Sequence, residues 1–216
     1  MTIITKDITV RHTIFTLTNQ RALYWKEHET LVVSDLHIGK TAHFRKAGIA
    51  IPSAVLDSDL HRLQTLIDHF VVRHILIVGD LFHAENNTDI DQFQRFMQAN
   101  SSVSFELIKG NHDRFKDAFY QTMNIAVFKT HKDIDEVRFV HDEQHCDADM
   151  FCISGHTHPG VTIKGRGKVF IKLPCFEVSE QRLILPAFSE FTGLNTKRTV
   201  DYAVCYGFTA KSLFAL

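Results

Sequence analysis

The sequence predicts an α/β protein, because short apolar runs alternate with amphipathic segments along the first half of the chain. The apolar runs have the length of buried strands and cover residues 30–34, His74–Val78 and Ser104–Ile108. Between them, residues from about 55 to 70 and from about 89 to 99 repeat apolar side chains with the period of a helix. Strand, helix, strand, helix, strand in this order is typical of a sheet with parallel strands.

The rest of the chain indicates further strands. From residue 3 to residue 25, β-branched and aromatic residues are broken by polar ones, a pattern that suits short antiparallel strands. The second half of the chain contains five short runs that we interpret as successive strands, at 136–141, 150–154, 161–164, 169–173 and 182–185. The whole pattern predicts an α/β protein with a mixed sheet, or with two sheets packed face to face between helices.

Length, composition and charge limit the classes of protein. With 216 residues, of which 44% are hydrophobic and 23% charged, the chain suits a single globular domain over residues 1–216. The formal net charge of −1 argues against a strongly basic protein that binds nucleic acid without specificity, so any phosphate recognition has to be local. The N-terminal sequence lacks the regions of a signal peptide, and no run of about 18 apolar residues predicts a membrane span. We therefore expect a cytoplasmic protein with no membrane partner.

The cysteines give no sign of a disulfide framework. Cys146, Cys152, Cys175 and Cys205 are scattered along the chain without a CxxC pair. In a cytoplasmic chain of this size, the pattern predicts four reduced, buried side chains.

Asp, Asn and His residues gather directly after the predicted strands. The clusters are Asp35-Leu36-His37, Gly79-Asp80, Gly110-Asn111-His112-Asp113, His141 and Gly155-His156-Thr157-His158. Each cluster alone is compatible with an ordinary turn, where Asp, Asn and Gly are common. Together they indicate a shared site, because open α/β sheets bind ligands beyond the carboxyl ends of their parallel strands.

The residue types in these clusters favour a metal site. They offer carboxylate, carboxamide and imidazole ligands without a thiolate, a set that suits Mn²⁺, Fe or Zn²⁺. His156 and His158 stand two residues apart, so an extended backbone would direct both imidazoles to the same side. We therefore predict that the clusters bind metal together.

In this order, the clusters resemble the motifs of the calcineurin-like metallophosphoesterase superfamily. Longer stretches are similar to the ligase-associated DNA damage response endonucleases, the PdeM family: DLHIGKTAHFRKAGIAIP (35–52), GDLFH (79–83), GNHDR (110–114), GHTHP (155–159), LPCF (173–176) and LPAFSEFTG (185–193). The similarity extends from about residue 22 to about residue 198. It implies a calcineurin-like metallophosphoesterase fold, two mixed β-sheets packed face to face and flanked by helices. The chain departs from the family pattern after His141, where Asp-Glu-Gln replaces Glu-Pro, and at Leu194, where a second glycine is frequent.

The resemblance also implies two divalent metal ions, with Mn²⁺ as the first choice and Fe or Zn²⁺ as alternatives. Carried over by position, the ligands of one ion would be Asp35, His37, Asp80 and His158. The ligands of the other ion would be Asp80, Asn111, His141 and His156. Asp80 would then bridge the two ions, and His145 is the alternative to His141 as the isolated ligand histidine.

Further residues are candidates for catalysis and substrate binding. The resemblance implies that His112 is the catalytic histidine, which protonates the leaving group or stabilises the transition state. Asp113 either orients the His112 imidazole or occupies the N-terminus of a helix. Arg45 and Lys40 are candidate phosphate contacts. Phe44 and Phe188 are candidates for stacking on a base. His83 is either a substrate contact or a plain turn residue.

Three functional hypotheses follow. The first is a nuclease or phosphodiesterase acting on DNA, which the family resemblance implies together with a functional association with an ATP-dependent DNA ligase, an exonuclease and a helicase. The second is a small-molecule phosphoesterase acting on a nucleotide or a lipid-sugar diphosphate. The third is a non-enzymatic scaffold. The presence of the required residue types at all seven ligand positions and at His112 argues against it.

Overall fold

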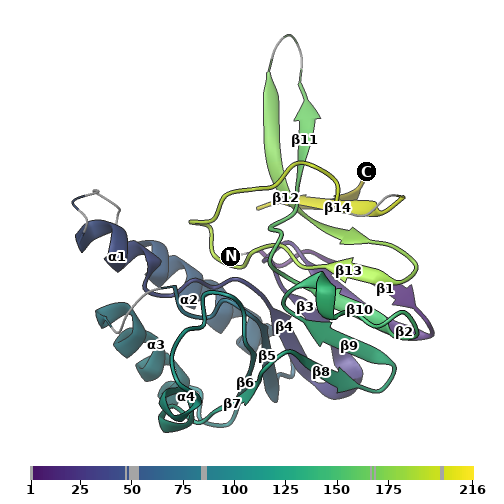
Figure 1. The fold of residues 1–216 in the computed structure, drawn as a ribbon. Coiled ribbons are helices and arrows are strands. Elements are labelled where there is room, and N and C mark those ends of the chain that lie inside the picture. Colours follow the sequence, from purple (N-terminus) through teal and green to yellow (C-terminus); the bar gives the residue numbers. More distant parts are fainter. Residues whose placement is uncertain are drawn as a thin grey trace.

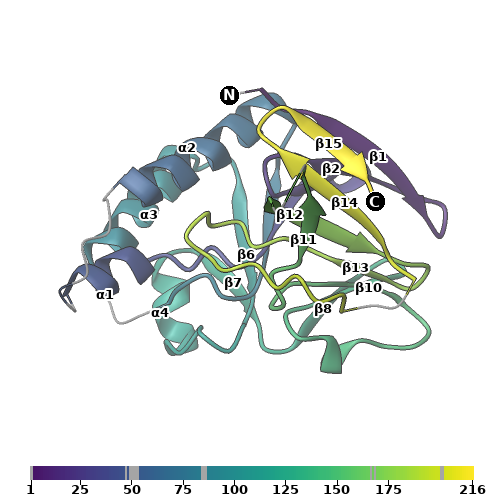
Figure 2. The ribbon, with the colours of Figure 1, turned by 90° about the horizontal axis from the view of Figure 1, so that it is seen from above.

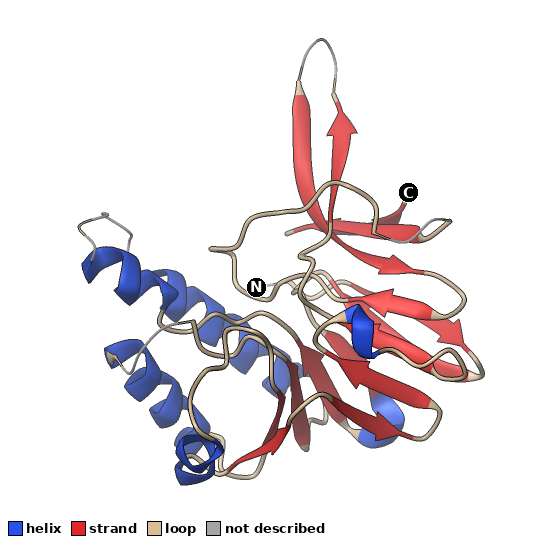
Figure 3. Cartoon of the chain, in the orientation of Figure 1, coloured by secondary structure: helices blue, strands red, loops and turns tan. Residues whose placement is uncertain are grey.

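The computed structural model describes residues 2–46, 48, 54–83, 87–165, 167, 169–199 and 202–216. Two β-sheets face each other, and helices cover the outer side of one of them (Figure 1, Figure 3). The predicted fold class, two mixed sheets packed face to face with flanking helices, is confirmed. The helices that contribute to a core lie on the first sheet only, within the described residues.

Within the described part of the chain, the first sheet has seven strands, which follow the order of the sequence. Its first four strands pair antiparallel, as the N-terminal pattern predicts, and the strands from β4 to β7 run parallel. The strands are β1 (Thr5–Val10), β2 (Thr13–Thr18), β3 (Leu23–Trp25), β4 (Thr30–Val33), β5 (His74–Val78), β6 (Ser104–Ile108) and β7 (Ile125–Phe128).

The second sheet is built from the later half of the chain, in the order β15-β14-β12-β13-β10-β9-β8, with β11 paired to β12. Strand β10 pairs parallel with β9 and with β13, and the remaining pairs are antiparallel. The strands are β8 (His131–Ile134), β9 (Val137–Val140), β10 (Phe151–Ser154), β11 (Gly160–Lys164), β12 (Phe170–Val178), β13 (Arg182–Ile184), β14 (Val204–Thr209) and β15 (Ser212–Ala215).

Helices connect the parallel strands of the first sheet. Figure 2 shows them together on the side of this sheet that faces away from the second sheet. The predicted long helices agree with the observed ones to within one residue. These helices are α1 (Lys40–Lys46), α2 (Ala54–His69), α3 (Thr88–Ala99) and α4 (Asp117–Thr122). Two short 3-10 turns lie elsewhere, η1 (Lys26–His28) before β4 and η2 (Glu143–His145) before β10. None of the described helices is long and apolar enough to cross a membrane.

The central parallel strands β4 and β5 are mainly apolar because both of their faces are buried. In β5, Ile75 and Ile77 pack into the core beneath the helices, and Leu76 and Val78 pack into the core between the sheets. Side chains of a strand alternate between its two faces, so a strand covered on both sides needs consecutive apolar residues. The ends of the buried stretches therefore set where the chain leaves β4, β5 and β6.

The prediction of four reduced cysteines is wrong for two of them. A disulfide joins Cys146 and Cys152, whose Cα atoms lie 5.7 Å apart, whereas Cys175 and Cys205 are free and buried. The turn η2 folds the chain back, so Cys146 reaches the start of β10 across a separation of only six residues. No spacing rule signals such a short bridge, because it depends on the path of the turn.

Candidate metal centre

The seven predicted ligands lie at one end of the two sheets. They come from the loops that follow β4, β5 and β6 in the first sheet, and β9 and β10 in the second. These strands run parallel within each sheet, so their carboxyl ends meet at a common edge. The loops carry Asp35 and His37, Asp80, Asn111, His141, and His156 and His158, respectively.

One group of possible ligand atoms belongs to Asp35, His37 and His158. All of these atoms lie within 4.8 Å of one another, and His158 Nε2 is 3.1 Å from Asp35 Oδ1. Neighbouring ligands that each lie about 2.1 Å from one ion, at right angles, are separated by about 3 Å. The spacing of this group therefore suits one metal ion.

A second group surrounds the Nε2 atom of His141. This nitrogen lies 3.1 Å from His156 Nδ1, 3.2 Å from Asn111 Oδ1 and 3.5 Å from Asp80 Oδ1. Ligand atoms of Asp35, Asp80 and His141 also lie within 4.8 Å of one another, which connects the second group to the first. The two groups are thus adjacent, with the two carboxylates between them.

Several atoms of the first group are buried without a hydrogen-bond partner among the described residues. They are both ring nitrogens of His37, together with Oδ1 of Asp35 and Nε2 of His158, which lie 3.1 Å apart but do not form a hydrogen bond. Burying polar atoms in this state costs free energy unless something satisfies them. Burial also lowers the pKa of His37 to about 3, so its imidazole is neutral at pH 7 and offers a lone pair to a cation. Divalent metal ions fit these residues.

The backbone of the site is strained. Five of the seven candidate ligands have a positive φ, which non-glycine residues adopt at a cost of about 1 kcal/mol each. The angles are 56° at Asp35, 48° at His37, 52° at Asp80, 68° at His156 and 50° at His158. The expectation that His156 and His158 point to one side of an extended backbone is therefore wrong. Their left-handed turn sends His156 to the second group and His158 to the first.

A glycine and a serine allow the close approach of these loops. A Cβ at position 155 would overlap the hydroxyl of Ser34, so only glycine fits there. The Ser34 hydroxyl contacts the Asp35 carboxylate and lies 2.9 Å from the carbonyl oxygen of Val78. Sequence reasoning missed Ser34, although a buried hydroxyl at the end of an apolar strand, directly before a ligand, is a usable signal.

The imidazole of His112 borders the second group. Its Nε2 lies 4.0 Å from Asp80 Oδ2, and its backbone N–H donates to Asp80 Oδ1 over 2.9 Å. The ring is one-third exposed and stacks on His83, with 4.7 Å between the ring centroids. His83 is thus part of the site's rim, and not an isolated turn residue.

Asp113 occupies a place that neither sequence interpretation predicts. Its buried carboxylate accepts the backbone N–H groups of Gly110 (2.9 Å), Phe82 (3.1 Å) and Leu81 (3.4 Å), and the hydroxyl of Tyr120 (3.4 Å). Helix α4 begins only at Asp117, and these hydrogen bonds go to the backbone and Tyr120 instead of the His112 ring. Burial raises the pKa of Asp113 to about 6. Asp113 holds the loops of Asp80 and Asn111 together.

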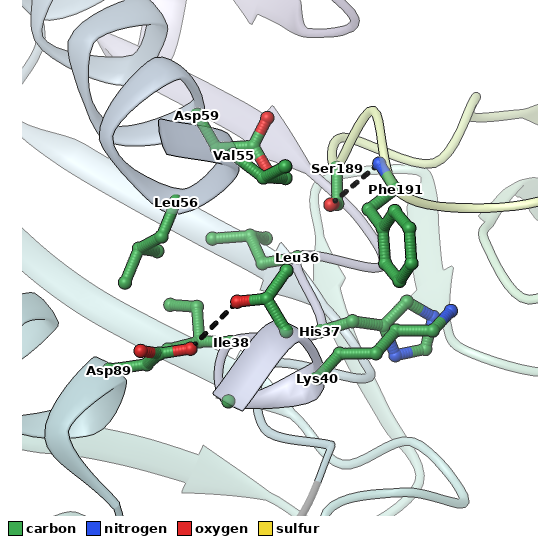
Figure 4. Close-up of a pocket in the computed structure, with 12 residues that line it drawn as sticks. Leu36, His37, Ile38, Lys40, Val55, Leu56, Asp59, Asp89, Ser189 and Phe191 are labelled. Carbon is green, nitrogen blue, oxygen red and sulfur yellow. Dashed lines mark hydrogen bonds between the residues drawn. The ribbon is translucent and has the colours of Figure 1, made fainter. Parts of the chain in front are cut away.

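The two predicted phosphate contacts differ in their surroundings. Arg45 is paired with Asp89 (3.3 Å), whose other carboxylate oxygen accepts the hydroxyl of Thr41 (2.9 Å; Figure 4). Lys40 lies beside His37 in the pocket of Figure 4, 5.9 Å from the centre of the Phe191 ring. Burial lowers the pKa of Lys40, and the nearby charges of Asp35 and Asp80 oppose that shift. The charges of these two carboxylates act on Lys40, so Lys40 lies close to the candidate metal centre.

The two phenylalanines considered for base stacking also differ in their surroundings. Phe188 is almost fully buried, with the guanidinium of Arg62 4.9 Å from its ring centre, so it belongs to the core. Phe44 is half-buried and meets Phe191 edge to face at 5.9 Å. Phe191 was not singled out from the sequence, because nothing distinguishes it from the other phenylalanines before its loop is placed.

The calcineurin-like phosphoesterase model matches residues 28–157, more than half of the 216 residues. The chain belongs to this family. It is therefore a hydrolase that acts on phosphate esters, and membership implies divalent metal ions. The sequence motifs and the structural similarity below are consistent with the PdeM group of calcineurin-like phosphoesterases.

Three solved structures are similar to this chain to different degrees. The crystal structure of the nuclease MPE from Pseudomonas putida has a TM-score of 0.84 at 26% sequence identity, over 99% of this chain and 100% of that chain. A protein of unknown function from Aquifex aeolicus has a TM-score of 0.43 at 16% identity, over 65% of this chain and 82% of that chain. A predicted phosphoesterase from Streptococcus pneumoniae has a TM-score of 0.34 at 13% identity, over 82% and 80%. No curated protein sequence matches the chain.

Proposed function

We propose that this phosphoesterase is a two-metal DNA endonuclease, folded as a single domain over residues 1–216. The observation that carries the proposal is the convergence of seven oxygen and nitrogen ligands in two adjacent groups, with a further imidazole, His112, at their edge. The similarity to a Pseudomonas putida nuclease over the whole chain supports nucleic acid as the substrate.

In this proposal each ion has four protein ligands. One ion is held by Asp35, His37, Asp80 and His158. The other ion is held by Asp80, Asn111, His141 and His156. The proximity of Asp80 to both Asp35 and His141 supports its role as the bridge.

When bound, the two ions would lower the pKa of a water nucleophile and act as Lewis acids toward the phosphate oxygens. Only two carboxylates, Asp35 and Asp80, stand against four positive charges, so the loaded site attracts an anionic phosphate although the chain is nearly neutral. Lys40 adds a cation at the same place. The protein's own contribution is to bind and orient the ester.

His112 would donate a proton to the leaving oxygen or stabilise its charge. Its one-third exposed ring is open to substrate, and stacking on His83 restrains its orientation. Asp113 acts through the backbone, by fixing the loop from which His112 projects. We therefore assign catalysis to His112 and a positioning role to Asp113.

We propose Mn²⁺ as the metal, with Fe and Zn²⁺ as alternatives, because four imidazoles and three oxygen ligands form a set without sulfur. The similarity of the motifs to the PdeM family supports a cytoplasmic role in DNA repair. It also supports a functional association with an ATP-dependent DNA ligase, an exonuclease and a helicase.

The alternative substrate is a small molecule, a nucleotide or lipid-sugar diphosphate ester. The net charge of −1 favours this alternative, because it provides no bulk attraction for DNA. Both substrates would use the same metal centre, so they differ only in what is bound outside it.

The purified protein with Mn²⁺ should be tested on supercoiled DNA, on linear DNA and on bis(4-nitrophenyl) phosphate. We expect hydrolysis of the diester and nicking of supercoiled DNA, both abolished in Asp80→Asn, which also controls for contaminating nucleases. Hydrolysis of a nucleotide diphosphate ester without cleavage of any DNA would establish the small-molecule alternative. Inactivity on every phosphate ester would leave the two-metal proposal without support.

A further inference from the structure

Strands β11 and β12 form a hairpin that projects from the body of the protein (Figure 1). At its base, Val161 lies against Gly207 of β14, and farther out the hairpin is exposed. Phe170 is 62% exposed and Ile171 is 49% exposed, which is unusual for apolar side chains of this size. The hairpin is not explained by the metal centre or by the core.

The sequence of the hairpin, residues 160–174, contains basic residues and no acidic ones. Between Asp149 and Glu177 there is no acidic residue, and the basic residues are Lys164, Arg166, Lys168 and Lys172. Lys164 and Lys172 lie in the described part of the two strands, and both are exposed. A chain with a net charge of −1 thus concentrates positive charge on one projecting element.

The strand register separates the hairpin into two different faces. Lys164 pairs with Phe170 and Thr162 pairs with Lys172, so these four exposed side chains share one face. The pairs Val161–Leu173 and Ile163–Ile171 form the other face. The first face therefore presents an exposed aromatic ring between two lysines, the combination that binds a nucleic-acid strand by stacking and by phosphate contacts.

The root of the hairpin is the metal-binding turn itself. His158 is followed directly by Pro159 and then by β11, and the backbone N–H of Gly160 donates to the carbonyl oxygen of Asn195 (2.8 Å). From His158 to Lys164 is six residues, about 20 Å of extended chain. Several nucleotides on one side of the reacting phosphate fit into that length.

We propose that the β11–β12 hairpin is a nucleic-acid-binding arm, whose Lys164, Phe170 and Lys172 face holds the substrate strand beyond the metal centre. The inference rests on the proposed nuclease function and adds the surface that recognises the polymer. The positive charge favours a polyanion over an apolar partner such as a second copy of this chain. It also explains how a nearly neutral protein binds DNA.

The test compares two double variants of equal charge. Lys164→Glu/Lys172→Glu changes the arm, and Lys6→Glu/Lys26→Glu changes two exposed lysines of strand β1 and the turn η1. Each replacement changes the charge by −2, so both variants go from −1 to −5. Binding of a fluorescent oligonucleotide is measured in EDTA at several salt concentrations, and hydrolysis of bis(4-nitrophenyl) phosphate is measured with Mn²⁺.

For the arm variant we expect at least tenfold weaker oligonucleotide binding and a salt slope reduced by about 1.4 to 1.8, since each lysine–phosphate contact contributes about 0.7 to 0.9. The control variant should lose less than threefold. Phe170→Ala should weaken binding by about fivefold or more through lost stacking, with little change in salt slope. All of these variants should hydrolyse the small diester at the rate of the unaltered protein.

Three results would overturn the arm. Equal losses in both double variants would reduce the effect to bulk charge, and lost diester hydrolysis in the arm variant would make the hairpin a support for the metal turn. Unchanged oligonucleotide binding by the arm variant would also contradict the proposal. If the unaltered protein is then a dimer that the arm variant separates in sedimentation, the hairpin is a self-association surface. The nuclease function is judged separately, by whether the unaltered protein cleaves DNA.

Discussion

The Nδ1 atom of His141 lies 3.0 Å from the carbonyl oxygen of Val78. Val78 ends β5 of the first sheet and His141 follows β9 of the second, so this contact joins the two sheets at the metal centre. Because a carbonyl only accepts, Nδ1 carries the proton and the lone pair of Nε2 faces the other ligands. The contact fixes both the tautomer and the orientation of the ring.

Gly79→Ala tests this contact. Gly79 has φ +81°, and a Cβ there would overlap the His141 imidazole, so alanine should displace the ring. We expect affinity for one of the two ions to fall by about 10- to 100-fold, the usual effect of disturbing a ligand's supporting contacts. Calorimetric titration with Mn²⁺ measures it.

Gly193→Ala is the matched control, because a Cβ at Gly193 meets no atom within 4 Å. It should bind both ions as the unaltered protein does. Equal affinity in Gly79→Ala and the control would mean that His141 is not held through Val78.

The roles of Asp80 and His112 should separate in metal content. Asp80→Asn should impair both ions, because a neutral amide bridges two cations poorly. His112→Ala should retain both ions and lose about 10²- to 10⁴-fold in turnover, the usual contribution of a general acid. Elemental analysis beside diester hydrolysis distinguishes these outcomes. Loss of both metals in His112→Ala would remove it from the catalytic role.

Asp113→Ala should destabilise the fold. It leaves three backbone N–H groups, two of them buried, without their acceptor, so we expect a loss of about 3 kcal/mol in the free energy of unfolding. Tyr120→Phe removes only the long 3.4 Å hydrogen bond and should cost less than about 1 kcal/mol. Urea unfolding of the metal-free proteins measures both. Full stability of Asp113→Ala, with activity lost, would restore a catalytic role for Asp113.

Lys40 and Arg45 should differ in their effect on DNA binding. Lys40 lies near both carboxylates of the centre, whereas Arg45 already pairs with Asp89, so Lys40 is the better phosphate contact. Lys40→Ala should reduce the slope of log affinity against log salt by about 0.7 to 0.9. Arg45→Ala should change this slope little and lower the melting temperature. The reverse pattern would return the phosphate contact to Arg45.

The sequence predicts the parallel strands and the convergence of the candidate ligand residues, for physical reasons. Strand β5 is apolar from Ile75 to Val78 because this stretch is buried on both faces, and its end is marked by Gly79 and Asp80. Such signals are local, so they can be read without a structure. The resemblance to known motifs then supplies which histidines belong together.

Other features depend on contacts between distant parts of the chain. The hydrogen bonds of Asp113 to Leu81 and Phe82 bridge two loops, and the pairing of Arg45 with Asp89 joins two helices. The short helix α1 and the Cys146–Cys152 disulfide likewise depend on how a turn is placed. A propensity or spacing rule contains none of this information.

The central claim is that two metal ions occupy the two ligand groups around Asp80. The most direct test is a crystal structure of the protein grown with Mn²⁺, with an anomalous difference map recorded at the manganese edge. We expect two peaks about 3.5–4 Å apart, each about 2.0–2.3 Å from its ligand atoms, with Asp80 touching both. A map with no peak among these residues, or with manganese bound only elsewhere on the protein, would contradict the claim.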